Sequence, residues 1–132
     1  MNAVDTNVLL RYIVDDDPEQ SAKAASFFRA RTADDPAFIS LIVLVELTWV
    51  LRRLYRYPRS QIHAVLLQMV ETEGLAFEEE HVVVELVHGE AASRDELVDH
   101  LIAHAASKAG CGRTLTFDRR AATRVAGMEL LT

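Results

Sequence analysis

Short apolar runs alternate with helical patterns along this 132-residue chain, and this alternation limits its fold more than any other feature. The predicted strands cover residues 2–4, 37–40, 75–77, 113–117 and 128–131. Strands separated by helices pair in parallel, because the chain must cross back before the next strand can run the same way. The sequence therefore predicts an α/β fold, with a five-stranded parallel sheet flanked by helices on both faces.

The segments between these strands are predicted to be helices, because their apolar residues recur at helical spacing. Val8, Leu9, Tyr12 and Ile13 recur at helical spacing, and the segment 17–19 reads as an N-cap followed by a first-turn proline and acid. The remaining helices are predicted at about 18–31, 41–55, 60–73, 79–87, 94–109 and 119–125. A chain of this size fits one core, so we expect residues 1–132 to form a single domain.

The composition limits the class of protein. No apolar run approaches the roughly 18 residues that a membrane span needs, and the N-terminus carries no basic and apolar leader, so we expect a cytoplasmic protein without a membrane partner. The lone cysteine, Cys111, is expected to be a small buried residue. The net charge of -6 argues weakly against nucleic acid, but residues 48–70 contain arginines and no acidic residue.

Two aspartates end predicted strands that should be neighbours. In a doubly wound sheet the chain leaves a crevice at the carboxyl ends of the strands where its winding direction switches, here between the first and fourth strands. Asp5 ends the first strand and Asp118 ends the fourth. Each also has a structural alternative, because an aspartate before a helix often caps its free N–H groups. Together at one edge they would repel each other unless a cation lay between them.

Glu46 interrupts the apolar segment Leu41–Leu51, which predicts a largely buried helix. No lysine or arginine lies three or four residues away to pair with it. A buried, unpaired carboxylate costs several kcal/mol, so Glu46 is expected to meet either a metal ion or an arginine from elsewhere in the fold. A side chain that reaches the surface is the third alternative.

Asp99 lies at the edge of the apolar face of the predicted helix 94–109, beside small alanines that allow close approach to the sheet. The alternative is an ordinary solvated acidic face. His100 and His104 are four residues apart on that helix, a spacing that zinc sites use, but no third ligand accompanies them and no zinc site is expected.

Oxygen ligands without sulfur favour a hard ion, Mg²⁺ or Mn²⁺. Such an ion makes a bound water nucleophilic and stabilises a departing oxygen, which suits phosphodiester hydrolysis. Arg119 and Arg120 directly follow Asp118 and, with the arginines at 52–59, are candidates for contacts with the backbone of a polynucleotide.

Four segments together resemble the PIN-domain family, in particular VapC-type toxins of bacterial toxin–antitoxin pairs. They are "AVDTNVLLRYIVDDDPEQ", "ISLIVLVELTWVL", "LVDHLIAHAASKAG" and "TLTFDRRA", in the family's order and approximate spacing. The resemblance implies a metal-dependent ribonuclease with strand order 3-2-1-4-5, normally dimeric and inhibited by a VapB-type antitoxin. It also implies the catalytic and metal-binding set, which is Asp5, Glu46, Asp99 and Asp118.

Further positions of the family pattern are occupied by polar residues. Thr6, Asn7 and Thr116 match neighbours that support the acids, and Glu96 stands where many relatives carry an aspartate. The helical hairpin at about 41–73, with its aromatic residues, is a candidate dimer or antitoxin interface, and packing within the domain is its alternative.

Two other functions fit a small α/β domain with acidic residues at strand ends. A phospho-signalling receiver would need an aspartate ending the middle strand and a lysine ending the last, and neither is evident. A PIN scaffold without catalytic activity would keep the fold for partner binding, but the four retained acids argue against it.

Overall fold

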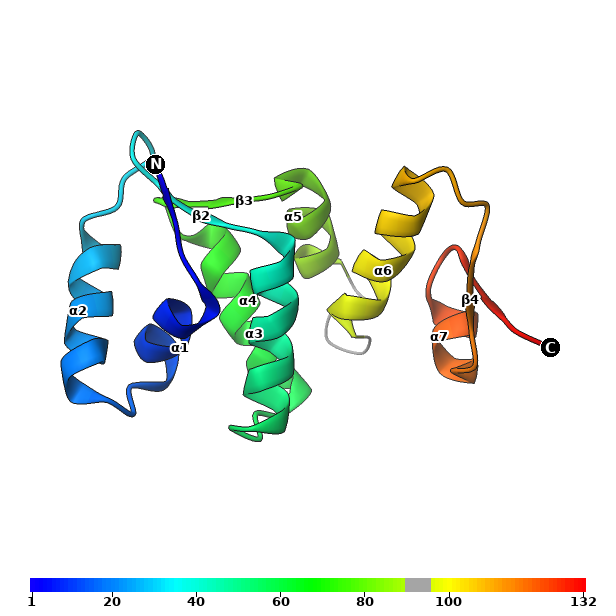
Figure 1. Ribbon diagram of the computed structural model, residues 1–132, viewed down its shortest axis with the longest axis horizontal. Coiled ribbons are helices and arrows are strands. Elements are labelled where there is room, and N and C mark those ends of the chain that lie inside the picture. The colour runs from blue at the N-terminus through cyan, green and yellow to red at the C-terminus, as the bar shows by residue number, and fades with distance from the viewer. Residues whose placement is uncertain (90–95) are drawn as a thin grey trace. The chain divides into compact units, whose positions relative to one another are not determined.

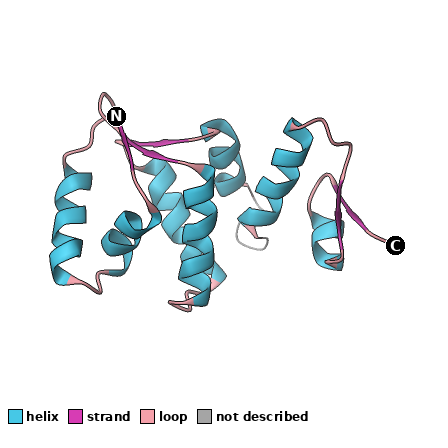
Figure 2. Cartoon of the chain, in the orientation of Figure 1, coloured by secondary structure: helices cyan, strands magenta, loops and turns pink. Residues whose placement is uncertain are grey.

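A computed structural model describes residues 1–89 and 96–132, and Figures 1 and 2 show its helices and strands. The chain divides into two compact units, Met1–Val87 and His88–Thr132, which are described separately. Within the described ranges there are seven helices and five strands, all strand pairs are parallel, and no helix is long and apolar enough to span a membrane. The predicted α/β class and its sequence of elements are confirmed.

The first unit contains a three-stranded sheet in the order β1-β2-β3. Ala3 of β1 aligns with Phe38 of β2, which aligns with Ala76 of β3. Helix α1 packs against α2 and α3, and α3 packs against α4 (Figure 1). The elements are β1 (Asn2–Ala3), α1 (Thr6–Val14), α2 (Pro18–Arg29), β2 (Ala37–Ile39), α3 (Leu41–Arg53), α4 (Arg59–Glu71), β3 (Leu75–Phe77) and α5 (Glu80–His88).

Local signals begin the helices of this unit. The Asp17 side chain accepts a hydrogen bond from the Gln20 amide at 3.1 Å and caps α2, whose first residue is a proline. Ser40 caps α3 in the same way at 3.2 Å. The buried face of α3 centres on Leu44, Leu47 and Leu51, each fully or almost fully buried. Each such side chain stabilises the unit by about 1.5–3 kcal/mol relative to an exposed one.

From residue 96 onward the second unit contains the parallel pair β4-β5 and two helices. Its core cluster is small and joins Ala103, Ala121 and Val125, with Met128 packed against it. Leu115 and Phe117 are exposed, at 49% and 80% of their surface. The elements are α6 (Leu97–Lys108), β4 (Thr114–Thr116), α7 (Arg119–Arg124) and β5 (Met128–Leu130).

Outside the candidate site, two expectations differ from the structure, and one extends beyond the described residues. The described strands form two sheets, of orders β1-β2-β3 and β4-β5, and the predicted single five-stranded sheet is not confirmed. Cys111 is exposed and not a buried residue, because it follows the end of α6 in a turn. The predicted helix 94–109 is described from Leu97, and its first positions lie outside the described residues.

Candidate active site

Asp5 follows β1 after one intervening residue, Val4, and caps α1. Its Oδ1 accepts a hydrogen bond from the Thr6 amide at 2.7 Å. The side chain is exposed, and its Oδ2 makes no hydrogen bond to any residue that the structure describes. The helix-cap alternative is therefore correct, yet it occupies only one of the two carboxylate oxygens and leaves the other available to a ligand.

Asp118 repeats this arrangement after β4. Its Oδ1 accepts hydrogen bonds from the amides of Arg120 at 2.9 Å and Ala121 at 3.1 Å, which caps α7. The Asp118 amide donates to Thr116 Oγ1 at 3.0 Å, so the predicted supporting hydroxyl fixes the backbone of the acid. Within residues 1–89 and 96–132, Oδ2 of Asp118 makes no hydrogen bond, and the side chain is exposed.

Glu46 is exposed, so it is not the buried carboxylate that the apolar segment predicted, and the third alternative, a side chain at the surface, is the one observed in α3. The helix buries the side that carries Leu47 and Leu51, and Glu46 lies on the other side with Ile42 and Trp49. Those two apolar side chains are 81% and 55% exposed. Because Glu46 is solvated, it needs no compensating charge in this unit, and its carboxylate has no ion pair among the described residues.

Asp99 lies in the first turn of α6 and is half-buried. Its amide donates to the carbonyl of Glu96 at 3.2 Å, and Glu96 occupies the N-cap position without a side-chain cap bond. The buried residues of α6 are Leu101 and Ala103, while Ile102 is exposed. The predicted position of Asp99 at the edge of the buried face agrees with its partial burial.

The four acids are divided between the two units. Asp5 and Glu46 belong to Met1–Val87, and Asp99 and Asp118 belong to His88–Thr132. Across residues 1–89 and 96–132, no three histidine, cysteine or acidic side chains form a group that could hold a metal ion. The convergence of the four acids therefore remains a prediction.

The chemistry of the donors nevertheless fits a hard divalent ion. Asp5 and Asp118 each present one carboxylate oxygen that no described residue engages, and oxygen is the ligand that Mg²⁺ and Mn²⁺ prefer. Thr6, next to Asp5, is buried, and its Oγ1 has no hydrogen-bond partner in the part of the chain described. An unpartnered buried hydroxyl is costly, which is consistent with a polar ligand near this acid.

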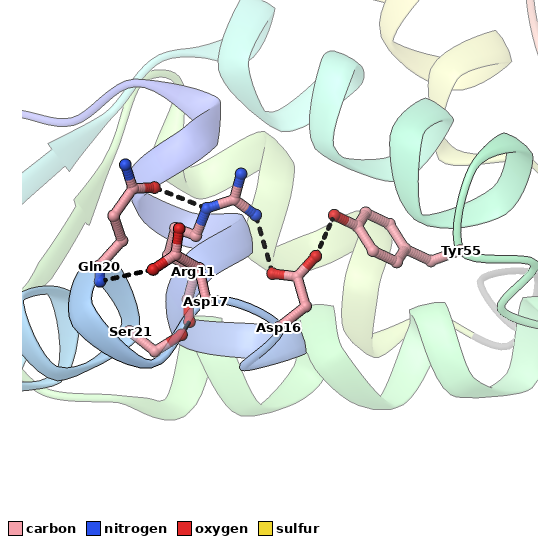
Figure 3. A network of polar contacts seen from close by, with 6 residues as sticks. All are labelled: Arg11, Asp16, Asp17, Gln20, Ser21 and Tyr55. Carbon is pink, nitrogen blue, oxygen red and sulfur yellow. Dashed lines mark hydrogen bonds and ion pairs between the residues drawn. The ribbon is translucent and has the colours of Figure 1, made fainter.

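A network of polar contacts joins the end of α1 to the start of α2 and the turn after α3 (Figure 3). Arg11 Nη1 donates to Asp16 Oδ1 at 2.8 Å, Arg11 Nε donates to Gln20 Oε1 at 2.7 Å, and Tyr55 Oη donates to Asp16 Oδ2 at 3.0 Å. The Tyr55 hydrogen bond, with the charge of Arg11, lowers the pKa of Asp16 below its usual value. The same tyrosine, and then the Asp16 charge, raise the pKa of Arg11.

The sequence did not single out Arg11 or its partners. The sequence does contain a spacing that could have drawn attention to them. Asn7 and Arg11 are one helical turn apart on α1, and Gln20 lies in the first turns of α2. Arg11 and Gln20 lie on different helices, separated by the end of α1 and a turn. Their contact therefore cannot be predicted from the spacing of residues within one helix.

Comparison with known proteins adds one match. A family model described as "PIN domain" matches residues 3–128, which is nearly the whole chain. No curated protein and no solved structure matches.

Proposed function

Because the chain belongs to the PIN-domain family, whose members are generally metal-dependent nucleases, we propose that it is a Mg²⁺-dependent endoribonuclease and the toxin of a VapBC toxin–antitoxin pair. The observation that carries this proposal is the same at Asp5 and Asp118. Each acid follows a strand, caps the next helix with one oxygen and keeps the second oxygen unengaged within the described residues.

The metal ligands proposed are Asp5, Glu46, Asp99 and Asp118, for Mg²⁺ or Mn²⁺. Glu46 is exposed and therefore able to reach an ion or to orient a water. Glu96, at the N-cap position of α6, would support the metal site beside Asp99. Thr6, Asn7 and Thr116 would hold the acids in place.

This set requires Asp118 to lie beside Asp5, which follows if β4 pairs with β1 in the order 3-2-1-4-5. The two observed sheets, β1-β2-β3 and β4-β5, match the two halves of this strand order. Inner strands of parallel sheets are normally covered on both faces, whereas Asn2 and Ala3 of β1 are exposed and Leu115 of β4 is half-exposed. The exposed strands support a proposed single sheet and a single domain of residues 1–132.

The reaction proposed is hydrolysis of an RNA phosphodiester. A bound divalent ion supplies a nucleophilic water and stabilises charge on the departing oxygen. Water adds to phosphorus, the bond to the 3′ oxygen breaks, and that oxygen takes up a proton, which leaves 5′-phosphate and 3′-hydroxyl ends. Arg119 and Arg120 are exposed beside Asp118 and are proposed to contact the RNA backbone.

The proposed partners are RNA, a VapB-type antitoxin and a second copy of the chain, in the cytoplasm. Exposed apolar side chains on and after α3 support a protein interface: Ile42, Trp49 and Leu54. Sedimentation equilibrium of the free protein tests the dimer, and a monomeric mass at micromolar concentration would contradict it.

The test of activity is RNA cleavage by purified protein, with Mg²⁺ or with EDTA, beside the Asp5→Ala variant. We expect cleavage only with Mg²⁺ and only in the wild type, with 5′-phosphate ends. Cleavage by well-folded Asp5→Ala at the wild-type rate would remove Asp5 from the mechanism. Absence of cleavage in every condition, together with antitoxin binding, would favour the inactive scaffold.

A further inference from the structure

An open pocket of about 760 Å³ lies in the first unit, between α1, α2, α4 and the start of β3. Its volume is within the range of about 300–1,000 Å³ that small-ligand sites occupy. Helix α4 presents one face to it, because its lining residues recur at helical spacing: Gln61, Val65, Gln68, Met69 and Thr72. The four proposed metal ligands, which all belong to the described residues, do not line it. The pocket is therefore separate from the proposed metal site.

The proposed joining of the two sheets leaves this pocket beside an edge strand. In the order 3-2-1-4-5, β4 pairs with β1, and β3 is the outermost strand at the other edge. Leu75 of β3 lines the pocket, and the residues of β1 do not. Asp5 and Tyr12 are seven residues apart, which is about 10 Å along the axis of α1. A ligand in the pocket would therefore bind apart from the metal ion.

Three aromatic side chains from different elements line the pocket. Tyr12 of α1 and Phe28 of α2 pack with their ring centroids 4.9 Å apart, and Tyr12 is 49% exposed. Tyr57 lies in the turn between α3 and α4, and its amide donates to the Leu51 carbonyl at 2.9 Å, which fixes this turn against α3. Partly exposed aromatic rings beside an open pocket are suited to stacking with a planar ring of a ligand.

Polar groups of the lining are available to a ligand. The polar groups of four lining side chains make no hydrogen bond to any described residue: Tyr12, Tyr57, Gln61 and Gln68. An apolar peptide face laid over these groups would bury them without partners, which is unfavourable. A nucleobase carries donors and acceptors along its edge as well as an aromatic face, so it matches both kinds of group in the lining.

The lining also contains an available cation. Arg29, at the end of α2, is exposed, and its guanidinium makes no ion pair or hydrogen bond with the described part of the chain. Arg31 is already engaged, because its Nη1 donates to Asp35 at 2.8 Å and its guanidinium lies 4.4 Å from the centre of the Phe27 ring. Glu73 also lines the pocket and would oppose an anion there. Arg29 is therefore the group suited to a phosphate.

The turn that carries Tyr57 adds positive charge next to the pocket. Residues 48–70 contain no acidic side chain. Within them, Arg53 and Arg56 are exposed and form no ion pair among the residues described, and Arg56 directly precedes Tyr57. Proteins that bind single-stranded nucleic acid combine cations along the backbone with aromatic rings on which bases stack. The pocket and this turn together have both features.

We propose that this pocket binds one unpaired nucleotide of the RNA substrate, at a distance from the bond that is cut. Tyr12 and Tyr57 supply the aromatic surface on which its base stacks, and the two glutamine amides form hydrogen bonds with the edge of the base. Arg29 binds a phosphate of this nucleotide, and Arg56 binds the phosphate of a neighbour. The inference rests on the proposed ribonuclease function and names the form of its substrate, which is RNA with a single-stranded segment.

The experiment measures binding apart from cleavage. A fluorescein-labelled single-stranded RNA of mixed sequence, about 12 nucleotides long, is titrated in EDTA with the full chain, and the anisotropy gives Kd at several salt concentrations. The same RNA annealed to its complement is the second probe, because paired bases are stacked within the duplex and cannot enter the pocket. Circular dichroism checks that each variant is folded.

Each pocket variant has a matched control. Arg29→Gln is compared with Lys23→Gln, which removes one positive charge from the same helix at a position outside the pocket lining. Tyr12→Leu keeps an apolar side chain against Phe28 and removes the aromatic face. It is compared with Trp49→Leu, which removes an exposed aromatic ring outside the lining.

We expect Tyr12→Leu to weaken binding of the single strand by about fivefold or more and to leave binding of the duplex within about twofold of wild type. Arg29→Gln should weaken single-strand binding by about three- to tenfold and reduce the slope of log K against log salt by about 0.7. Both control variants should stay within about twofold of wild type. Glu73→Gln, which removes the acid of the lining, should strengthen binding.

Equal Kd values for Arg29→Gln and Lys23→Gln would overturn the inference and leave the pocket to a protein partner. Equal weakening of the two probes by Tyr12→Leu would show that no unpaired base enters the pocket. The exposed Arg29 keeps the test decisive if Tyr12→Leu does not fold. Loss of single-strand binding in the pocket variants, without Mg²⁺-dependent cleavage by wild type, would overturn the nuclease proposal and leave the pocket assignment intact.

Discussion

Asp118 is expected to have two separable roles, one in folding and one in metal binding, and two substitutions distinguish them. Its Oδ1 accepts from two backbone amides at 2.9 and 3.1 Å, and its Oδ2 is unengaged by described residues. Asparagine keeps an oxygen acceptor for the cap and removes the negative charge. Alanine removes both functions.

The expected stability change follows from the cap geometry. Replacing an N-cap aspartate by alanine costs about 1 kcal/mol, whereas asparagine caps about as well as aspartate. The free energy of unfolding of a small protein falls by about 2 kcal/mol per molar urea. Asp118→Ala should therefore lower the urea concentration at the unfolding midpoint by about 0.5 M, and Asp118→Asn should lower it by much less. Both variants should lose Mg²⁺-dependent RNA cleavage.

Urea unfolding followed by circular dichroism, beside a gel assay of RNA cleavage, measures both roles. A variant Asp118→Asn that is as unstable as Asp118→Ala would refute the reasoning about the cap. A stable Asp118→Asn that cleaves RNA at the wild-type rate would refute the reasoning about the metal.

Three other predictions concern the rest of the chain. Because the pKa of Asp16 is lowered, its contribution to stability is present above its ordinary value of 3.8 and lost as pH falls through the folded value. In thermal melts, wild type should have a higher melting temperature than Tyr55→Phe at neutral pH, and this difference should shrink at pH values below 3.8. A difference in melting temperature that stays the same over this pH range would contradict the prediction. Gly74→Ala should destabilise by more than Gly110→Ala in urea, since both have positive φ but only at Gly74 would a Cβ atom approach a neighbour, at 2.9 Å; equal losses would argue against the close contact. Cys111 is exposed and should react with a thiol reagent in the folded protein as quickly as in urea, and protection in the native state would show that it is covered.

The order of helices and strands was predictable from sequence because it depends on local signals. The Asp17-Pro18 start of α2 and the Gly74 end before β3 are fixed by capping and by a positive φ, and both are readable without tertiary contacts. The two aspartates after strands were equally readable, since a polar residue that follows an apolar run and precedes a helix is a cap candidate whatever its other role.

Burial along α3 was not predictable, for a specific reason. Apolar residues occupy nearly every position of the helix, so the sequence pattern does not show which side faces the core. The structure buries the side of Leu44, Leu47 and Leu51. At about 100° per residue, Glu46 lies roughly 130° from the mean direction of these three leucines, which explains its exposure.

Whether β1 pairs with β4 also depends on contacts that local sequence signals do not encode. Each half of the predicted strand order is present. The proposed pairing of β1 with β4 would join residues that are more than 100 positions apart in the sequence. The Arg11 network was missed for a related reason, since it joins two helix ends and the turn at Tyr55.

Acids from both units are proposed to hold one metal ion, and a calorimetric titration with Mn²⁺ is the sharpest test of this proposal. Wild type, Asp5→Asn and Asp118→Asn are titrated in turn, because both variants retain a cap acceptor. We expect saturable Mn²⁺ binding that either substitution alone weakens by about tenfold or more. Wild-type affinity in either variant would show that its acid does not belong to the site and would contradict the shared centre.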